Sequence, residues 1–413
     1  MTERRPVRRG RRSGPGAALR VALLAAGTAL LAAATPAPGG AHAAELRIGV
    51  LQRADDERLE PKRLEQAYPG HPGGPLLQSV EVAVKERSFE LEAAKLQVKL
   101  ELREVRDAAD AKAQLQQLEK AGVAAAVLDL PAAWIAAAGP AVRLPLLNAG
   151  EPDEAPRLQA CLPNLFHTLP GHRMRADAVA QTLVARKWSR VLLLHGPTPA
   201  DAARLALAQA ALKRYALQTV AVKPFKLSGD PRERDLGNPL LLTGASVGDY
   251  DVVWVVDSDG EFARKLPYAT ARPRPVVGDA GLVAEAWAPR FERYGAPQLS
   301  RRFQRAAQRP MTAYDWAGYL AAKAVLQAAL EQPARPDAAA IDKALRAEGF
   351  TLDGFKGVRL SFRPWDRQLR QPLLMTDGLG VISTAPVDGM MHPKNALDTL
   401  GTDAAEPGCK ARP

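Results

Sequence analysis

Two carboxylates stand directly after the most apolar strand-like run of the sequence, residues 251–256. They are Asp257 and Asp259, and a serine lies between them. Such a pair can accept hydrogen bonds from a polyol, bind a cation or work as an acid/base pair. A structural role is also open, because an aspartate often caps the first turn of a helix and Asp259 precedes a short helical run. The sequence leaves both roles possible.

Several signatures that mark enzymes are missing from the sequence. It contains no H-E-x-x-H run, no P-loop and no G-x-G-x-x-G run after the first strand, and we expect no nucleophile elbow. His167 and His172 flank Pro170, so they are not expected to share a helix face, and no cysteine pair lies near them for a zinc site. We therefore assign no catalytic residue, no metal and no cofactor, and we expect a binding protein and not an enzyme.

The elements that must position these residues alternate along the chain. Strands are predicted at 46–51, 96–102, 123–128 and 142–147, with helices at 76–95, 108–121 and from 131 onward. Residues 53–74 have no apolar period and are predicted to form a loop. This alternation predicts an α/β fold with a parallel sheet and right-handed crossovers.

The pattern restarts after residues 166–170 and predicts a second α/β unit. Its helices are expected at 174–187 and 200–215, and its strands at 190–194, 217–222, 251–256 and 275–278. The last third differs, with helices at 312–331 and 336–347 and a terminal pair of strands at 364–374 and 381–382.

Residues 1–43 are predicted to be a cleaved signal peptide for export to the periplasm. Seven arginines and one glutamate accompany an apolar run at 17–34, which is short for a membrane span of ~20 residues, and Ala41-His42-Ala43 forms a small-residue cleavage site. An uncleaved anchor and twin-arginine export are the alternatives. Cleavage would lower the formal net charge from +11 to +5, so the charge balance does not predict a nucleic-acid partner.

The two cysteines, Cys161 and Cys409, both follow the predicted signal peptide. Export would place them in an oxidising compartment, where a disulfide bridge is favoured over two free thiols. The bridge would tie the C-terminal tail to the body of the protein.

The order of several short motifs resembles the type I periplasmic solute-binding proteins of ABC transporters, the group that includes branched-chain amino acid binders. These motifs are Arg47–Val50, Leu144–Leu147 with Asn148–Gly150 after it, Asn164–Thr168 and Met311–Ala317. The resemblance implies two Rossmann-like lobes with parallel sheets and a three-segment hinge. Lobe 1 would hold residues 44–166 plus 290–354, lobe 2 would hold 167–289 plus 355–385, and 386–413 would form a tail. It also implies a monomer that captures a small-molecule solute and delivers it to a membrane permease.

A second set of motifs is similar to the branch of these proteins associated with PQQ-dependent alcohol catabolism. They are Trp287–Leu299, Asp315-Trp316, Phe362–Asp366, Gln368–Pro372 and Asn395–Gly401. This likeness implies a small polar organic solute and a role beside quinoprotein dehydrogenases, without identifying the ligand.

Candidate ligand residues follow the predicted strands, because open α/β sheets bind ligands beyond the carboxyl ends of their strands. They are Asp129, Asn148, Ala149 and Gly150 in lobe 1, His195, Asp257 and Asp259 in lobe 2, and Tyr268 and Trp287 near the lobe crossover. Asn148 and Gly150 fit turn chemistry equally well, and the two aromatic residues fit interlobe packing. The serines and threonines that amino acid binders place after the matching strands are missing. An acidic lining would instead favour a hydroxyl, an amine or a cation.

Two further functions remain open. The same fold could serve a periplasmic sensor or a cofactor or metal delivery protein. A periplasmic enzyme would use Asp257 and Asp259 as an acid/base pair.

Overall fold

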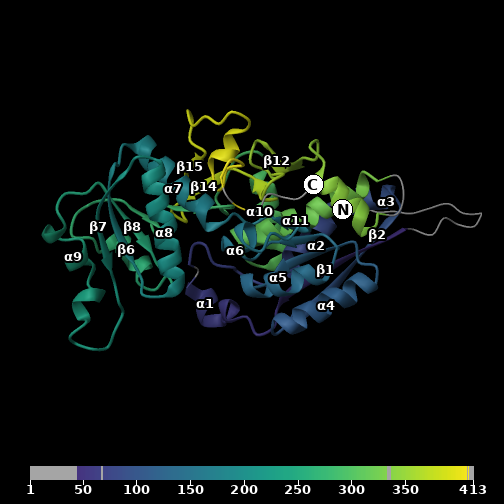
Figure 1. Ribbon diagram of the computed structural model, residues 1–413, viewed down its shortest axis with the longest axis horizontal. Coiled ribbons are helices and arrows are strands. Elements are labelled where there is room, and N and C mark those ends of the chain that lie inside the picture. The colour runs from purple at the N-terminus through teal and green to yellow at the C-terminus, as the bar shows by residue number, and fades with distance from the viewer. Residues whose placement is uncertain (1–43, 67, 333–335, 407, 409–413) are drawn as a thin grey trace, which may run out of the picture. The chain divides into compact units, whose positions relative to one another are not determined.

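The computed structural model describes residues 44–66, 68–332, 336–406 and 408. The predicted signal peptide and Cys409 lie outside these residues. The first sheet is parallel and has the order β2-β1-β3-β4-β5 (Figure 1). Its strands are β1 (Ala44–Arg53), β2 (Leu96–Val105), β3 (Ala125–Asp129), β4 (Leu146–Asn148) and β5 (Leu165–His167).

Helices cover both faces of this sheet, because its strands are apolar on both sides. In β1, Ile48 and Val50 face one core and Leu51 faces the other, and Val127 and Leu128 divide in the same way in β3. The helices on the Ile48 face are α2 (Leu76–Glu86), α3 (Ser88–Ala93), α10 (Ala296–Ala307), α11 (Ala313–Leu330) and α12 (Ala338–Arg346). Those on the Leu51 face are α4 (Ala108–Lys120) and α5 (Ala132–Ala138).

The second sheet is also parallel, in the order β7-β6-β8-β9. Its strands are β6 (Arg190–His195), β7 (Gln218–Pro224), β8 (Val252–Val256) and β9 (Val276–Gly278). The helices α7 (His172–Arg186) and α8 (Pro199–Arg214) pack on one face. The other face is covered by Phe225, Tyr250, Phe262 and residues of α9 (Pro239–Leu242).

Short antiparallel strands complete the fold. A three-stranded sheet consists of β10 (Val283–Glu285), β14 (Leu373–Thr376) and β15 (Val381–Ala385), and a second one of β11 (Leu352–Asp353), β12 (Arg359–Phe362) and β13 (Leu369–Arg370). The remaining short helices are α1 (Pro61–Gln66), α6 (Ala155–Leu158) and the 3-10 helices η1 (Glu57–Leu59), η2 (Gly139–Ala141), η3 (Arg234–Gly237), η4 (Ala245–Val247), η5 (Ala263–Tyr268) and η6 (Ala396–Thr399).

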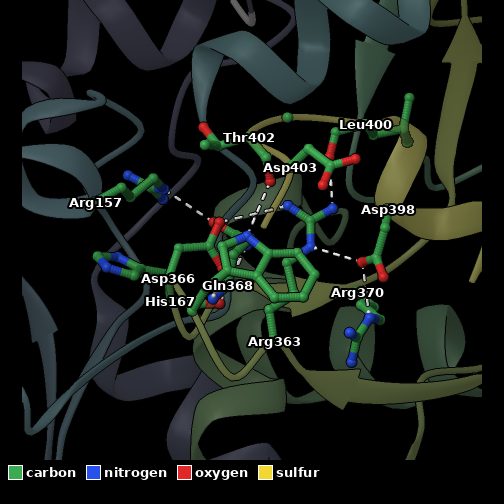
Figure 2. Close-up of polar contacts among 12 residues, drawn as sticks. Arg157, His167, Arg363, Asp366, Gln368, Arg370, Asp398, Leu400, Thr402 and Asp403 are labelled. Carbon is green, nitrogen blue, oxygen red and sulfur yellow. Dashed lines mark hydrogen bonds and ion pairs between the residues drawn. The ribbon is translucent and has the colours of Figure 1, made fainter. Parts of the chain in front are cut away.

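The chain passes between the two parallel sheets three times: after β5, after β10 and near β13. Arg157, which is buried, lies at the first passage and donates to the carbonyls of Glu151, Asp153 and Leu169 at 3.0, 2.6 and 2.8 Å. It also donates to the side chain of Gln368 at 2.9 Å (Figure 2). Gln368 in turn donates to the carbonyl of Leu169 at 3.2 Å, so two passages are joined by a satisfied polar network.

The architecture confirms the predicted fold class, with differences in individual elements. Residues 53–74, predicted as a loop, contain the short helices η1 and α1. The helix α10 was missed, because its mostly basic and polar exposed residues conceal the apolar stripe of Leu299 and Phe303. Among the described residues, no helix is long and apolar enough to cross a membrane.

A buried arginine holds the C-terminal segment against the body. Arg363 donates to Asp398 at 3.0 Å and to the carbonyl of Leu397 at 3.0 Å, and Arg370 donates to the same carboxylate oxygen at 2.8 Å (Figure 2). The indole of Trp365 donates to the carbonyl of Thr402 at 3.0 Å. Asp398 is fully buried, so its charge depends on these partners.

We therefore expect the substitution Arg363→Met to lower the free energy of unfolding by about 3–5 kcal/mol, because it leaves a buried carboxylate with one cation fewer. Urea unfolding of the purified protein measures this. The control is Lys226→Met, which breaks a largely exposed pair with Glu233 and should cost less than about 1 kcal/mol. Equal effects of the two substitutions would contradict the role assigned to Arg363.

Candidate functional site

A cavity of about 500 Å³ lies where the carboxyl ends of β8 and β9 face the segment that follows β1. One wall consists of residues 57–72 and Tyr314, and the other of residues from α7, α8 and β10 and from the turns after β8 and β9. The position agrees with the rule for open α/β sheets, and the volume is in the range of small-molecule sites.

Arg175 on α7 is the most notable cation of the cavity. Its Nη2 atom lies 3.5 Å from Oε2 of Glu285 on β10, and both side chains are largely buried. The Nε and Nη2 atoms of Arg175 and Oε2 of Glu285 have no hydrogen-bond partner among the described residues. Burial raises the pKa of Glu285, against the effect of Arg175. Two nitrogens of the guanidinium therefore have no hydrogen bond, and both are covered in this structure.

Gly70 allows the opposite wall to approach this pair. Its φ is +79°, a conformation that favours glycine, and a Cβ atom there would lie 3.0 Å from Glu285 and 3.2 Å from Arg175.

Three further arginines line the cavity, and each has an acidic partner. Arg58 donates to Asp56 at 2.6 Å and to Asp129 at 2.8 Å. Arg63 donates to Asp259 at 2.6 Å, which joins the segment after β1 to the turn after β8. Arg204 lies 3.6 Å from Asp279.

Two histidines in the cavity wall are neutral at physiological pH. Burial, together with the charges of Arg204 and Arg175, lowers the pKa of His71 to about 4. Burial likewise lowers the pKa of His172 to about 3, although a contact with Asp153 at 3.4 Å opposes this. The cations on this side of the cavity are therefore the arginines alone, and each of them lies beside a carboxylate.

The acidic side of the cavity contains Asp257, which is mainly structural. Its two oxygens accept from the backbone N–H groups of Asp259 at 3.2 Å and Ala263 at 2.9 Å. Burial raises the pKa of Asp257, and Asp279 contributes to the increase. The capping role considered for Asp259 belongs to Asp257, while Asp259 pairs with Arg63.

The rest of the lining is apolar or aromatic. The hydroxyl of Tyr314 has no hydrogen bond to the residues the structure describes, and burial raises its pKa. The apolar surface comes from Pro69, Ala176, Val179, Leu207, Trp254, Val256 and Val283. The cavity thus combines a cationic side with an apolar floor, which suits a ligand with an anionic end and an apolar body.

The structure separates the strand-end residues predicted in the first unit from the cavity. Asp129 reaches it only through Arg58. Asn148 accepts from the N–H groups of Gly150 at 3.3 Å and Glu151 at 2.9 Å, the pattern of a turn. Ala149 is buried and donates its N–H to Leu128. A Cβ atom on Gly150 would collide with Asp129, so this glycine serves close packing.

The other predicted residues divide between the cavity and elsewhere. Asp257 and Asp259 line it, whereas His195 lies outside with its ring 2.9 Å from the Gly196 carbonyl. Tyr268 is 91 % exposed. Trp287 is buried and stacks on Trp316 at 6.3 Å in the core of the first unit.

The sequence reasoning missed the arginines and histidines because it considered only residues after strands. Arg175 and His172 lie on α7 at helical spacing, and Arg58, Arg63 and His71 lie in the segment predicted as a loop. The cavity lining holds the carboxylates of Glu57, Asp257, Asp259, Asp279 and Glu285 beside the four arginines, so the acidic lining stays a prediction. The described residues contain no cluster of three or more His, Cys, Asp or Glu that could hold a metal ion.

A G-x-S-x-G run is present at residues 244–248, which corrects the expectation that no such motif exists. It is not a nucleophile elbow. The run follows α9 and not a strand, and Ser246 is exposed in η4, where Lys223 donates to it at 3.4 Å.

Comparison with known proteins finds similarity in the fold alone. No family model matches the chain. No curated protein matches it either. A periplasmic binding protein from Burkholderia mallei has a TM-score of 0.63 at 11% identity, over 89% of this chain and 99% of that one.

Two further solved structures are named by their ligands or transporters. A branched-chain amino acid ABC transporter periplasmic ligand-binding protein from Burkholderia xenovorans has a TM-score of 0.63 at 13% identity, over 82% of this chain and 95% of that one. A solute-binding protein of an ABC transporter from R. palustris, in complex with benzoate, has a TM-score of 0.58 at 12% identity, over 80% and 92%. Together with the two parallel sheets and three chain passages, these similarities show that the chain has the type I periplasmic binding protein fold.

Proposed function

We propose that this protein captures a small carboxylate-bearing organic solute in the cavity and presents it to the membrane permease of an ABC transporter. The observation that carries the proposal is the buried guanidinium of Arg175, whose Nε and Nη2 donors have no partner among the described residues. These two nitrogens are covered in this structure; once a shift of the surrounding wall exposed them, a carboxylate could take both donors in one bidentate contact, which is the geometry that guanidinium groups favour. His71 and His172 line the same cavity and are already neutral, so binding of the carboxylate would not require either imidazole to release a proton.

The apolar floor supports a solute with an aromatic or branched aliphatic body. Trp254, Val256 and Val179 contribute apolar surface to the cavity that the arginines also line. The similar R. palustris protein was solved with benzoate, a compound of this type. Asp257 and Asp259 would face polar groups on the remaining edge of the solute. We assign no catalytic role to any of these residues.

A second candidate is delivery of a cofactor, suggested by the motifs similar to the PQQ-associated branch. PQQ is a planar polycarboxylate, and the arginines at 58, 63, 175 and 204 all line the cavity. If the ligand is instead a small organic solute linked to PQQ-dependent alcohol catabolism, the same site would serve the uptake of that solute beside the quinoprotein dehydrogenases.

The periplasmic location and the disulfide also belong to this proposal. Gly408, which precedes Cys409, lies close to Leu158, since a Cβ atom on it would be 3.3 Å from that side chain. The Sγ atom of Cys161 is 3.9 Å from the carbonyl of the same leucine. The described residues Gly408 and Cys161 therefore lie near the same leucine, which supports the proposed bridge in an oxidising compartment.

The first experiment is a thermal-shift panel on the purified protein. It includes benzoate, 3,4-dihydroxybenzoate, branched-chain amino acids, short alcohols, polyols, PQQ, calcium and a lanthanide. A ligand at ~100 times its dissociation constant adds ~2.7 kcal/mol of apparent stability. We expect a shift from carboxylates and none from alcohols or polyols of similar size. A shift with PQQ alone would favour cofactor delivery, and a shift with alcohols alone would contradict the carboxylate proposal.

We expect Arg175→Met to weaken binding of the carboxylate found in that panel by roughly 10- to 100-fold, because one charged bidentate contact is lost. Isothermal titration calorimetry measures the change. The matched control is Arg232→Met, since Arg232 is 92 % exposed and outside the cavity, and it should leave affinity unchanged.

The double variant Arg175→Met with Glu285→Leu separates binding from folding. Both members of a buried ion pair are removed, so stability should be unchanged or higher while binding is lost. Full affinity in the double variant would show that the carboxylate binds elsewhere.

A further inference from the structure

A second hollow, a groove of about 960 Å³, lies outside the solute cavity and runs along β15. All eight residues of 379–384 and 386–387 line it, including Ile382 and its neighbours Val381 and Ser383. Successive side chains of a strand point to opposite faces of the sheet. Both sets can line one groove only when the groove runs along the edge of the strand. The groove therefore lies against the backbone edge of β15.

This edge has no strand partner among the described residues. In the sheet order β10-β14-β15, β15 is the last strand and pairs only with β14 (Figure 1). Natural proteins usually protect such an edge with charged side chains, but β15 reads Val-Ile-Ser-Thr-Ala. Ile382 is 50 % exposed and Leu379, just before the strand, is 81 % exposed. The edge is thus a β-prone, uncharged template for another strand.

The opposite wall of the groove is basic. Arg290, Arg293 and Arg359 line it, and none forms an ion pair or a side-chain hydrogen bond with the residues the structure describes. The acidic residues in the lining are Glu292 and Asp388. Three exposed guanidinium groups without partners favour an acidic occupant.

An aromatic side chain is fixed between these two walls. Tyr294 has a φ of 53°, a left-handed conformation that is uncommon for a bulky residue. Its ring covers Gly357, where a Cβ atom would lie 2.6 Å from the ring. The exposed ring thereby becomes a rigid apolar contact at the groove.

We propose that this groove is a docking site for an extended acidic segment of a partner protein, which adds to the sheet as a strand beside β15. The backbone of the segment would pair with the free edge of β15. Acidic side chains on one face would meet Arg290, Arg293 and Arg359, and apolar side chains on the other would pack on Leu379, Ile382 and Tyr294. The site is separate from the solute cavity and does not rest on the function proposed for it.

The test is selection of a phage-displayed library of random linear peptides on the immobilised full chain. We expect enrichment of peptides in which Asp or Glu alternates with apolar residues. The double variant R290E/R293E should lose these peptides by roughly tenfold or more, because their charge partners are reversed. The matched control R232E/R234E changes two exposed arginines outside the groove and should retain them. Circular dichroism and thermal unfolding show whether each variant is folded.

A synthetic copy of an enriched peptide, and a second copy with alternate backbone amides methylated, test the mode of binding by fluorescence polarisation. Strand addition requires the free N–H groups, so methylation should weaken binding by roughly tenfold or more. The proposal is overturned if no acidic peptides are enriched, if R290E/R293E binds them as well as wild type, or if the methylated copy binds equally. If no peptide is enriched and anionic lipid vesicles bind the groove instead, the groove would be assigned to a membrane surface. That outcome would also overturn the proposal.

Discussion

The hydrogen bonds of Arg157 fix the place where the chain leaves the first sheet, and the solute cavity depends on that place. A buried guanidinium is tolerated only when its donors are satisfied, and here three backbone carbonyls and Gln368 accept from it. The segment it holds leads directly into α7. The N–H of His172 donates to Pro152 and that of Arg173 to Glu154. Because α7 carries His172 and Arg175, this network sets how the cationic wall meets the cavity.

The cavity shows the opposite arrangement, with polar groups left unsatisfied. An unpaired buried donor costs free energy, and Arg175 has two such atoms beside a buried Glu285 that has one. A core selected only for stability would replace this pair with apolar side chains. Arg157 is more deeply buried and each of its guanidinium nitrogens is hydrogen-bonded, and this contrast is the physical reason for proposing the ligand at Arg175. Under the proposed function, a carboxylate would supply acceptors for the two Arg175 nitrogens, and that part of the cost would become affinity.

The groove along β15 and the cavity differ in how far their charged groups are buried and paired. The cavity is lined by buried charges with acidic partners nearby, and it suits a small solute that is enclosed. The groove exposes backbone, apolar side chains and unpaired arginines together, and it suits a longer chain that stays partly in water. Sheet β10-β14-β15 borders both, since Glu285 pairs with Leu374 and Leu374 with Thr384.

The sequence by itself determined the elements and their layers. Alternation of strand-like and helical runs gave both parallel sheets, and double-sided apolar strands such as 252–256 predicted that helices or loops cover both faces. The start of α11 is also set locally, because Asp315 closes a capping box with Thr312 three residues before it. These features depend on periodicity and on neighbours within a few residues, so the local sequence is enough to encode them. The strand-end rule also located Asp257 and Asp259 at the cavity.

Only the tertiary structure decided which charges meet. Arg175 on a helix and Glu285 on a strand belong to different elements, and Arg58 and Arg63 reach the cavity from a segment without apolar period. The free edge of β15 is equally invisible in the sequence, because a strand at the edge and one in the middle of a sheet can have the same composition. Ion pairs and edges depend on long-range packing, and no local pattern encodes the partner that a side chain finds, or fails to find, after the chain has folded.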